Sequence, residues 1–264
     1  MRKYLVIGNP IEHSLSPKLH NFWIKENNID AIYEKKKIND DEIFNLISQV
    51  REKKIHGINV TVPFKKTIIS FIDNLSHESE YTQSVNTICL ENNKIVGHNT
   101  DIEGFERSIR ELNLEISNKK VLILGAGGVV PSIIFALNKM KVSKIIISNR
   151  TKHKAESLKD LFKNLKIVDW GETPETDVVI NATSIGLKKE DEINLDFSKI
   201  GKNKFFYDVI YKPNETNFLR TGKKLGNRTE NGKLMFVYQA YAAFKKWHGI
   251  EPIISKKVFK LLDE

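Results

Sequence analysis

The stretch V-L-I-L-G-A-G-G-V-V-P at residues 121–131 most constrains how this 264-residue chain can fold. Its four leading aliphatic residues predict a short strand buried on both faces, as in a parallel sheet. A glycine cluster follows, and the apolar residues 131–137 then predict the first turns of a helix. Such a turn lets the backbone approach a pyrophosphate, which the helix N-terminus attracts. With Val130 at the usual third glycine position, the stretch alone fits a dinucleotide site and an ordinary strand-to-helix turn equally well.

The next strand favours the dinucleotide site. Residues 144–148 repeat the buried-strand pattern and lead into Asn149, Arg150 and Thr151. In an NAD site an acid normally stands here and hydrogen-bonds the ribose 2′-hydroxyl. Arg150 takes its place, and a guanidinium suits the 2′-phosphate of NADP. The alternative is a solvated arginine followed by a threonine N-cap, but with Lys154 nearby the corner favours NADP.

Composition indicates a globular protein of two modest domains. Hydrophobic residues make up 40% and charged residues 28% of the chain, and no apolar run approaches the length of a membrane span. The single cysteine, Cys89, excludes an internal disulfide and fits a reducing compartment, so we expect a cytoplasmic protein. The N-terminus leads straight into a predicted strand, so we expect no signal peptide. The net charge of +9 comes mostly from scattered lysines, which argues against nucleic acid as a partner.

Two serines precede the first predicted helix, at about residues 17–27. Ser16 stands before Pro17, as expected of an N-cap followed by a favoured first helical residue. That explanation leaves Ser14 without a role. Two hydroxyls before a helix N-terminus can also hold a carboxylate, and the capping and ligand-binding interpretations can both be true.

Lys65 and Asp101 follow predicted strands. The strand that begins at Gly57 stops at Pro63, which places Lys65 beyond its carboxyl end, where open α/β sheets bind ligands. Asp101 follows a predicted hairpin, with strands 86–90 and 94–98, and opens a helix. Lys65 alone could be a surface lysine and Asp101 a helix N-cap. As a pair, the carboxylate could orient the lysine and share its proton load.

The remaining segments complete an α/β chain. Residues 177–181 and 205–209 predict further buried strands, whereas the polar, lysine-rich residues 188–204 predict a mobile connection. Residues 234–247 predict a largely buried helix in which the amide of Gln239 needs a partner. The seven histidines show no metal-ligand spacing, so no metal site is expected.

A series of short motifs runs along nearly the whole chain. The motifs are S-L-S-P at 14–17, H-N at 20–21, N-V-T-V-P-F-K at 59–65, V-N-T at 85–87, N-T-D at 99–101, G-A-G-G at 125–128, N-R-T at 149–151, N-A-T-S-I-G at 181–186, D-V-I-Y at 208–211, and the segment from 232 to 240. In this order they resemble the motifs of the shikimate dehydrogenase family, whose members depend on NADP. The match is collinear over nearly the whole chain, and the ordered set is specific although no one motif is decisive.

The resemblance implies a role for each matched position. Lys65 becomes the proton-transfer residue with Asp101 as its partner, and Ser14 and Ser16 hold the substrate carboxylate. The other implied substrate contacts are Thr61, Asn86, Tyr211 and Gln239. The implied NADP(H) contacts are Gly125, Ala126, Gly127, Gly128, Val129, Asn149, Arg150, Thr151, Lys154, Val209 and Gly232.

Two residues depart from the family pattern. Pro131 stands near a position where relatives often carry arginine, so phosphate binding depends more on Arg150 and Lys154. His77 occupies a place where an acid often approaches the nicotinamide, which puts a contact there in doubt.

The expected fold is α/β: a substrate domain at 1–103, a Rossmann-type NADP domain at 104–237, and C-terminal helices at 238–264 that return to the first domain. The implied activity is the reversible reduction of 3-dehydroshikimate to shikimate, in aromatic amino acid biosynthesis, by a monomer or homodimer. The alternatives are a quinate-specific relative and a non-catalytic NADP sensor. A sensor has no need of a proton donor, so Lys65 with Asp101 argues against it.

Overall fold

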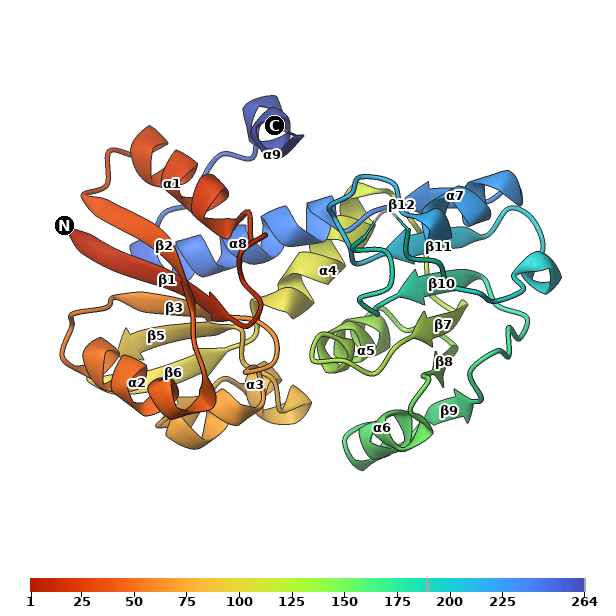
Figure 1. Cartoon of the computed structure of the whole chain (residues 1–264), viewed down its shortest axis with the longest axis horizontal. Helices are drawn as coiled ribbons and strands as arrows, with labels where there is room; N and C mark the ends of the chain where they lie inside the picture. The colour runs from red at the N-terminus through yellow and green to blue at the C-terminus, as the bar shows by residue number, and fades with distance from the viewer. Residues whose placement is uncertain (189, 264) are drawn as a thin grey trace. The chain divides into compact units, whose positions relative to one another are not determined.

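The computed structural model describes residues 1–188 and 190–263, which form two compact units. The first unit comprises Met1–Gly104 and Val237–Glu264, and the second comprises Phe105–Phe236. Each unit contains one six-stranded sheet with helices packed on it (Figure 1). The α/β class and the pairing of a substrate-type domain with a Rossmann-type domain are as the sequence predicts.

The first unit has a mixed sheet. Its strand order is β2-β1-β3-β5-β6-β4; β1 pairs in parallel with β2 and β3, whereas β5 is antiparallel to both β3 and β6. The strands are β1 (Arg2–Gly8), β2 (Ala31–Lys37), β3 (Gly57–Val60), β4 (Asn74–Leu75), β5 (Thr87–Glu91) and β6 (Lys94–His98). The helices are α1 (Ser16–Glu26), η1 (Asp40–Glu42), α2 (Ile43–Arg51), η2 (Thr67–Phe71), α3 (His77–Thr82), α4 (Thr100–Glu111), α8 (Lys233–His248) and α9 (Lys256–Asp263), of which α4 and α8 continue across a unit boundary.

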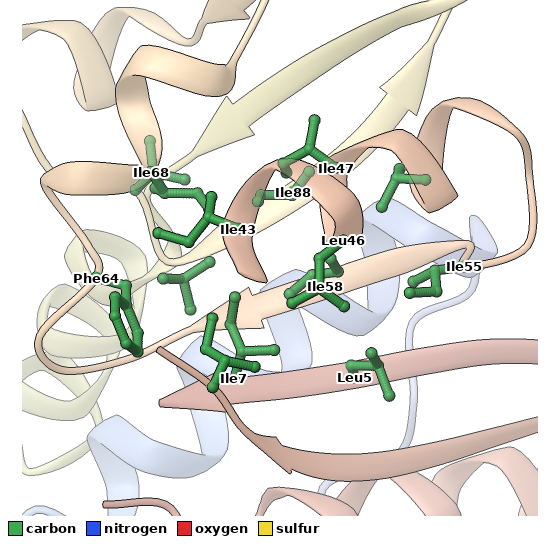
Figure 2. Packing of buried hydrophobic residues seen from close by; sticks show 14 of the residues in the cluster. Leu5, Ile7, Ile43, Leu46, Ile47, Ile55, Ile58, Phe64, Ile68 and Ile88 are labelled. Atoms are coloured by element: carbon green, nitrogen blue, oxygen red, sulfur yellow. The ribbon is translucent and has the colours of Figure 1, made fainter. Parts of the chain in front are cut away.

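An aliphatic core holds β3 and β5 in place. Ile58 of β3 lies opposite Ile88 of β5, and both side chains are fully buried. Leu46 and Ile47 of the amphipathic helix α2 belong to the same cluster (Figure 2). Because this core fixes β3 and the β5–β6 hairpin, it also fixes the chain segments that leave them.

The second unit has an all-parallel sheet in the order β12-β11-β10-β7-β8-β9. The strands are β7 (Lys120–Leu124), β8 (Lys144–Ser148), β9 (Leu165–Val168), β10 (Val178–Asn181), β11 (Phe205–Asp208) and β12 (Arg228–Glu230). The helices are α5 (Val130–Lys139), α6 (Lys152–Glu156), η3 (Ser157–Asp160), η4 (Ser198–Ile200) and α7 (Asn217–Lys224). The chain order reverses between β7 and β10, so the glycine turn after β7 lies at the switch point where such sheets bind ligands.

The connection before β11 differs from the expectation of a mobile segment. Phe197 and Ile200 are each only 2% exposed and belong to the core of the second unit. The Phe197 ring meets the Phe206 ring edge-on at 5.6 Å between centroids. The prediction that residues 188–204 form a mobile connection is therefore wrong around Phe197 and Ile200, because these apolar side chains anchor an otherwise polar segment in the core. Lys189 lies outside the described residues.

His20 of α1 is buried without any hydrogen-bond partner among the described residues. It is 1% exposed, and its ring stacks on that of Tyr33 with centroids 4.2 Å apart. Burial, reinforced by the charge of His248, lowers the pKa of His20 to about 3 from an ordinary 6.5. The unfolded chain therefore binds this proton more tightly than the folded chain does.

We accordingly expect stability to be complete above pH 6.5 and to fall as the pH drops toward 3, at up to about 1.4 kcal/mol per pH unit. The His20→Phe variant keeps a flat ring and cannot titrate. Urea denaturation between pH 4 and 7 should show a shallower loss for this variant than for the wild type. His153→Asn, at an exposed position, is the control. Equal slopes for wild type and His20→Phe would show that His20 does not set the acid sensitivity.

Candidate active site

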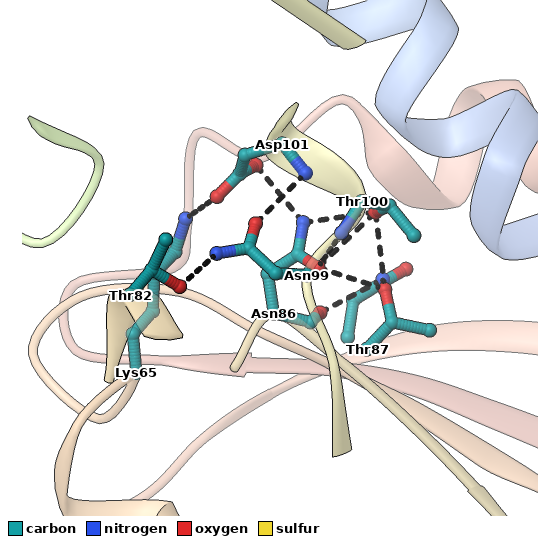
Figure 3. A network of polar contacts seen from close by, with 8 residues as sticks. Lys65, Thr82, Asn86, Thr87, Asn99, Thr100 and Asp101 are labelled. Atoms are coloured by element: carbon teal, nitrogen blue, oxygen red, sulfur yellow. Dashed lines mark hydrogen bonds and ion pairs between the residues drawn. The ribbon is translucent and has the colours of Figure 1, made fainter. Parts of the chain in front are cut away.

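The structure brings Lys65 and Asp101 together as a buried ion pair. Lys65 lies in the turn between β3 and η2, and Asp101 lies in the first turn of α4. The Lys65 ammonium donates a hydrogen bond to Oδ2 of Asp101, and the two side chains are only 10% and 8% exposed (Figure 3). The alternative that Lys65 is a surface lysine is therefore wrong. A buried pair of this kind needs further hydrogen bonds to offset the desolvation of its charges.

Asn86 supplies one of these hydrogen bonds. Its Nδ2 donates to Oδ1 of Asp101 and to Oγ1 of Thr100, each over 2.9 Å. Its Oδ1 accepts from the backbone N–H of Thr100 over 2.7 Å. Both amide hydrogens of Asn86 thus have partners within the protein. The family resemblance implies that Asn86 contacts the substrate. This geometry favours a different role, in which Asn86 positions Asp101.

A second layer, from Tyr33 and Asn59, fixes Asn86 in turn. Tyr33 donates its hydroxyl to Oδ1 of Asn59 over 2.7 Å. Nδ2 of Asn59 then donates to the Asn86 carbonyl oxygen and to Thr87 Oγ1, both at 3.0 Å. The role of Asn59 was not deduced from the sequence, although a buried amide inside a strand of aliphatic residues is a signal that a polar partner must exist.

Asp101 is not the N-cap that its position in the sequence suggested. Helix α4 begins at Thr100, so Asp101 is already inside the helix. The side chain of Asn99 accepts the Asp101 N–H over 3.2 Å and donates to Thr82 Oγ1 over 3.0 Å (Figure 3). Because Asn99 accepts the Asp101 N–H and Asn86 accepts the Thr100 N–H, the Asp101 carboxylate can accept from Lys65 and Asn86 instead. The helix N-terminus stabilises its negative charge.

The capping prediction for Ser16 is also wrong. Helix α1 begins at Ser16 itself, Leu15 occupies the N-cap position, and no side chain caps it there. Instead, Ser14 Oγ accepts the backbone N–H of Ser16 over 3.3 Å. The turn before α1 brings Ser14 close enough to take the helix donor that Ser16 was expected to satisfy. Ser14 is partly exposed and Ser16 is 8% exposed.

We therefore expect Ser14→Ala to weaken both substrate binding and stability. The substitution removes a hydroxyl from the proposed carboxylate site. It also removes the acceptor of the Ser16 N–H, so the free energy of unfolding should fall by about 0.5–1 kcal/mol. Ser16→Ala should raise KM with a smaller loss from capping. Thermal denaturation with steady-state kinetics on both variants checks this. Unchanged stability of Ser14→Ala would contradict the assignment of the hydrogen bond.

The other expected substrate contacts lie in three places. Thr61 is partly exposed after β3 and packs so closely on Gly8 that a Cβ at Gly8 would come within 2.5 Å of Thr61 Cγ2. Gln239 lies on the part of α8 that belongs to the first unit and is partly exposed, not on the buried side of the helix. Tyr211 belongs to the second unit, where its ring stacks on Phe236 at 4.4 Å.

The glycine turn after β7 has two kinds of glycine. Gly125 has φ +112°, and a Cβ there would meet the Ala182 carbonyl oxygen at 2.9 Å, so the fold itself requires glycine. Gly127 is exposed, and the nearest atom to a Cβ there would be the Ala182 oxygen at 4.0 Å. The packing of the fold would therefore accept a side chain at position 127. The open backbone at Gly127 leaves room for a ligand, as expected of the dinucleotide contact predicted here.

The polar corner after β8 presents two cations. Asn149 Nδ2 donates to the Thr151 carbonyl oxygen over 2.8 Å and so shapes the turn. Thr151 takes the N-cap position of α6 as predicted, but its side chain makes no capping hydrogen bond. Arg150 and Lys154 are exposed, and neither has an ion-pair partner in the described part of the chain. Both are therefore available to a phosphate group.

Two further residues shape this unit's ligand-binding edge. A Cβ at Gly232 would come within 2.1 Å of the Val209 carbonyl oxygen, so glycine lets these two segments touch. Pro131 is the second residue of α5. Because proline lacks an N–H, this helix end offers a phosphate one donor fewer.

Comparisons with known proteins agree over the whole chain. The model of the shikimate dehydrogenase substrate binding domain matches residues 6–88, and that of shikimate / quinate 5-dehydrogenase matches 107–204. The shikimate dehydrogenase (NADP(+)) of Pelagibacter ubique strain HTCC1062 is 58% identical over 262 residues, which cover 99% of both chains. That of Aquifex aeolicus strain VF5 is 38% identical over 250 residues, covering 94% of this chain and 91% of its own.

Solved structures of lower sequence identity share the fold over the whole chain. The crystal structure of shikimate dehydrogenase from Aquifex aeolicus aligns with a TM-score of 0.90 at 36% identity, covering 100% of this chain and 98% of that one. Shikimate 5-dehydrogenase from Thermus thermophilus, in complex with NADP(H) and shikimate, has a TM-score of 0.90 at 28% identity and covers 100% and 99%. No helix in the described residues is long and apolar enough to cross a membrane. With both family models matched and a relative 58% identical over nearly its full length, the chain belongs to the shikimate dehydrogenase family.

Proposed function

We propose that this protein catalyses the reversible, NADPH-dependent reduction of 3-dehydroshikimate to shikimate, with Lys65 as the proton donor. Its family membership and the names of its relatives support the reaction. The observation that supports the role of Lys65 is its burial in an ion pair with Asp101, held by Asn86. A buried, oriented ammonium is suited to a single proton-transfer task, whereas a surface lysine is not.

The chemistry follows from where charge develops. When bound, NADPH supplies the hydride that reduces the C3 ketone of the substrate. Negative charge then builds on the ketone oxygen, where the Lys65 ammonium stabilises it and donates the proton. In the reverse direction Lys65 accepts the proton of the C3 hydroxyl. Asp101 holds the ammonium in one orientation, and Asn86 holds Asp101.

The substrate is bound by hydroxyls and amides in this proposal. Ser14 and Ser16 hold the carboxylate at the start of α1, and their Oγ-to-N hydrogen bond keeps the two residues in a fixed relation. Thr61, Gln239 and Tyr211 contact the ring hydroxyls or the carboxylate. Asn86 contributes through Asp101 more than through direct contact, because Thr100 and Asp101 take both of its amide hydrogens.

The cofactor lies along the second unit's switch point in this proposal. Gly125, Ala126, Gly127, Gly128 and Val129 surround the pyrophosphate. Asn149, Arg150, Thr151 and Lys154 bind the 2′-phosphate end, and Val209 and Gly232 line the same site. Two observations support this placement: the open backbone at Gly127, and the exposed cations Arg150 and Lys154, which have no ion-pair partner among the described residues.

Arg150→Ala should weaken NADPH binding by about 10- to 100-fold and leave NADH binding nearly unchanged. The loss of one charge-assisted contact to a phosphate amounts to about 1.5–3 kcal/mol, and NADH lacks the phosphate. Fluorescence titration with each cofactor measures the effect. Lys159→Ala, which removes one exposed charge from the same unit, is the control for net charge. Equal losses for both cofactors would contradict the assignment.

The activity itself is tested by NADPH consumption with 3-dehydroshikimate and, separately, with 3-dehydroquinate. Turnover of the first at much the higher kcat/KM supports the proposal. Preference for the second identifies a quinate-specific relative. No turnover of either, with NADPH binding intact, would overturn the proposal in favour of a non-catalytic NADP sensor.

A further inference from the structure

The β5–β6 hairpin brings three metal-ligand side chains onto one face of the first sheet. Asn92 and Asn93 connect the strands with φ of 49° and 61°, the tight turn that suits a two-residue hairpin. Cys89 and Glu91 are two residues apart on β5 and so share a face. His98 on β6 pairs with Thr87, two residues before Cys89, and therefore lies on that face too. Spacing along the sequence did not reveal this cluster because it forms across two strands.

The ligand atoms are close to the arrangement that a zinc ion requires. The Cys89 sulfur, a Glu91 carboxylate oxygen and a His98 ring nitrogen lie within 4.8 Å of one another. His98 Nε2 is 2.7 Å from Glu91 Oε1. Around a tetrahedral zinc ion, bond lengths of about 2.0–2.3 Å put such donors roughly 3.3–3.6 Å apart. Side-chain shifts of about 1 Å would therefore complete the site.

We propose that Cys89, Glu91 and His98 form a binding site for one zinc ion, separate from the Lys65–Asp101 pair. Sulfur, imidazole and carboxylate are the ligands that zinc takes, and three of them leave a fourth position for water. The thiolate and the carboxylate balance the ion's two charges. Cys89 and His98 are buried, whereas the Glu91 side chain is 47% exposed and leaves a path for the ion.

The donor set sharpens the choice of metal. Magnesium and calcium prefer oxygen ligands, and this cluster offers an oxygen from Glu91 alone. Sulfur and imidazole ligands favour zinc instead.

Zinc in this site would stabilise the hairpin that leads into the active-site network. His98 directly precedes Asn99, whose side chain accepts the N–H of Asp101. A ligand that binds the folded chain and not the unfolded one raises the melting temperature. The proposal concerns metal binding and does not depend on the reaction that the protein catalyses.

The single cysteine makes the test specific. Titration of the metal-free protein with cobalt(II), a spectroscopic substitute for zinc, should produce a thiolate-to-cobalt absorption band, and Cys89 is its only possible source. We expect saturation at one cobalt per chain, loss of the band on addition of zinc, and a rise in melting temperature with zinc. Absence of the band, or a band that does not saturate at one per chain, would overturn the proposal.

Variants assign the other two ligands. Glu91→Gln and His98→Gln should each weaken cobalt and zinc binding by at least about 10-fold, as expected when a metal's coordination is disturbed. Glu80→Gln, an exposed carboxylate of the same unit, should bind as the wild type does. Cys89→Ser should show neither the band nor zinc-dependent stabilisation. Unchanged affinity in Glu91→Gln would remove Glu91 from the site and overturn the three-ligand proposal.

Discussion

A Lys65→Met enzyme is expected to lose about 100- to 10,000-fold in kcat, the usual range for removal of a general acid–base group. Methionine keeps an unbranched apolar stem in a site that is only 8% exposed, but it cannot stabilise charge on the ketone oxygen or donate a proton. NADPH affinity should be nearly unchanged, because the glycine turn and Arg150 belong to the other unit. Steady-state kinetics in both directions, with NADPH binding measured by fluorescence, checks both expectations.

Lys66→Met is the matched control for this variant. Lys66 is the next residue in the chain, carries the same charge and is exposed. Its substitution changes the net charge and the local sequence to the same extent as Lys65→Met does, so it should leave kcat within about twofold of the wild type. If Lys65→Met had near-normal turnover, proton transfer by Lys65 would be refuted and the buried ion pair would have a structural role alone.

Four strands of the second unit, β7, β8, β10 and β11, could be predicted from the sequence, whereas β9 and β12 were not. The four predicted strands are short, mostly apolar runs followed by glycine or polar turns, and that pattern depends on local residues only. The strand β12 is Arg-Thr-Glu and has no such pattern. The turn at Gly125 and the polar corner at Arg150 follow such runs, so their places at the strand ends could be predicted. The proximity of Lys65 and Asp101 was also predictable in outline, since both follow neighbouring strands, β3 and the β5–β6 hairpin.

The helix caps could not be predicted in the same way. Ser16 and Asp101 both have the residue type and position of an N-cap, and both are inside their helices. Ser14 and Asn99 take the backbone donors instead. Several nearby side chains compete for the same N–H groups, and tertiary packing decides which one wins. Capping propensity describes each residue alone and does not include this competition.

Contacts between distant segments were the least visible in the sequence. Asn59 and Asn86 are 27 residues apart, yet a hydrogen bond of 3.0 Å joins them. Cys89 and His98 meet only through the register of a hairpin. Phe197 is buried although the residues around it are polar. In each case the signal is a residue whose chemistry disagrees with its neighbours in the chain, and only the fold shows its partner.

Asp101→Asn should produce the second large effect, on turnover and stability together. The substitution leaves the Lys65 ammonium buried without its carboxylate, and breaking such a pair typically destabilises a protein by about 3–5 kcal/mol. The asparagine can still accept from Asn86, so the hydrogen-bond network outside the pair should survive. We expect kcat to fall at least about 10-fold, because the ammonium is no longer held in one orientation. Urea denaturation and steady-state kinetics measure the two losses.

The double variant Lys65→Met/Asp101→Asn distinguishes a coupled pair from two independent residues. It contains no unpaired buried charge at this site, so it should be more stable than Asp101→Asn alone, with a coupling energy of about 0.5–3 kcal/mol. Its kcat should be close to that of Lys65→Met, since Asp101 has no ammonium left to orient. If the losses of the single variants simply added in both stability and kcat, Asp101 would act separately from Lys65, and the proposed division into proton donor and orienting carboxylate would fail.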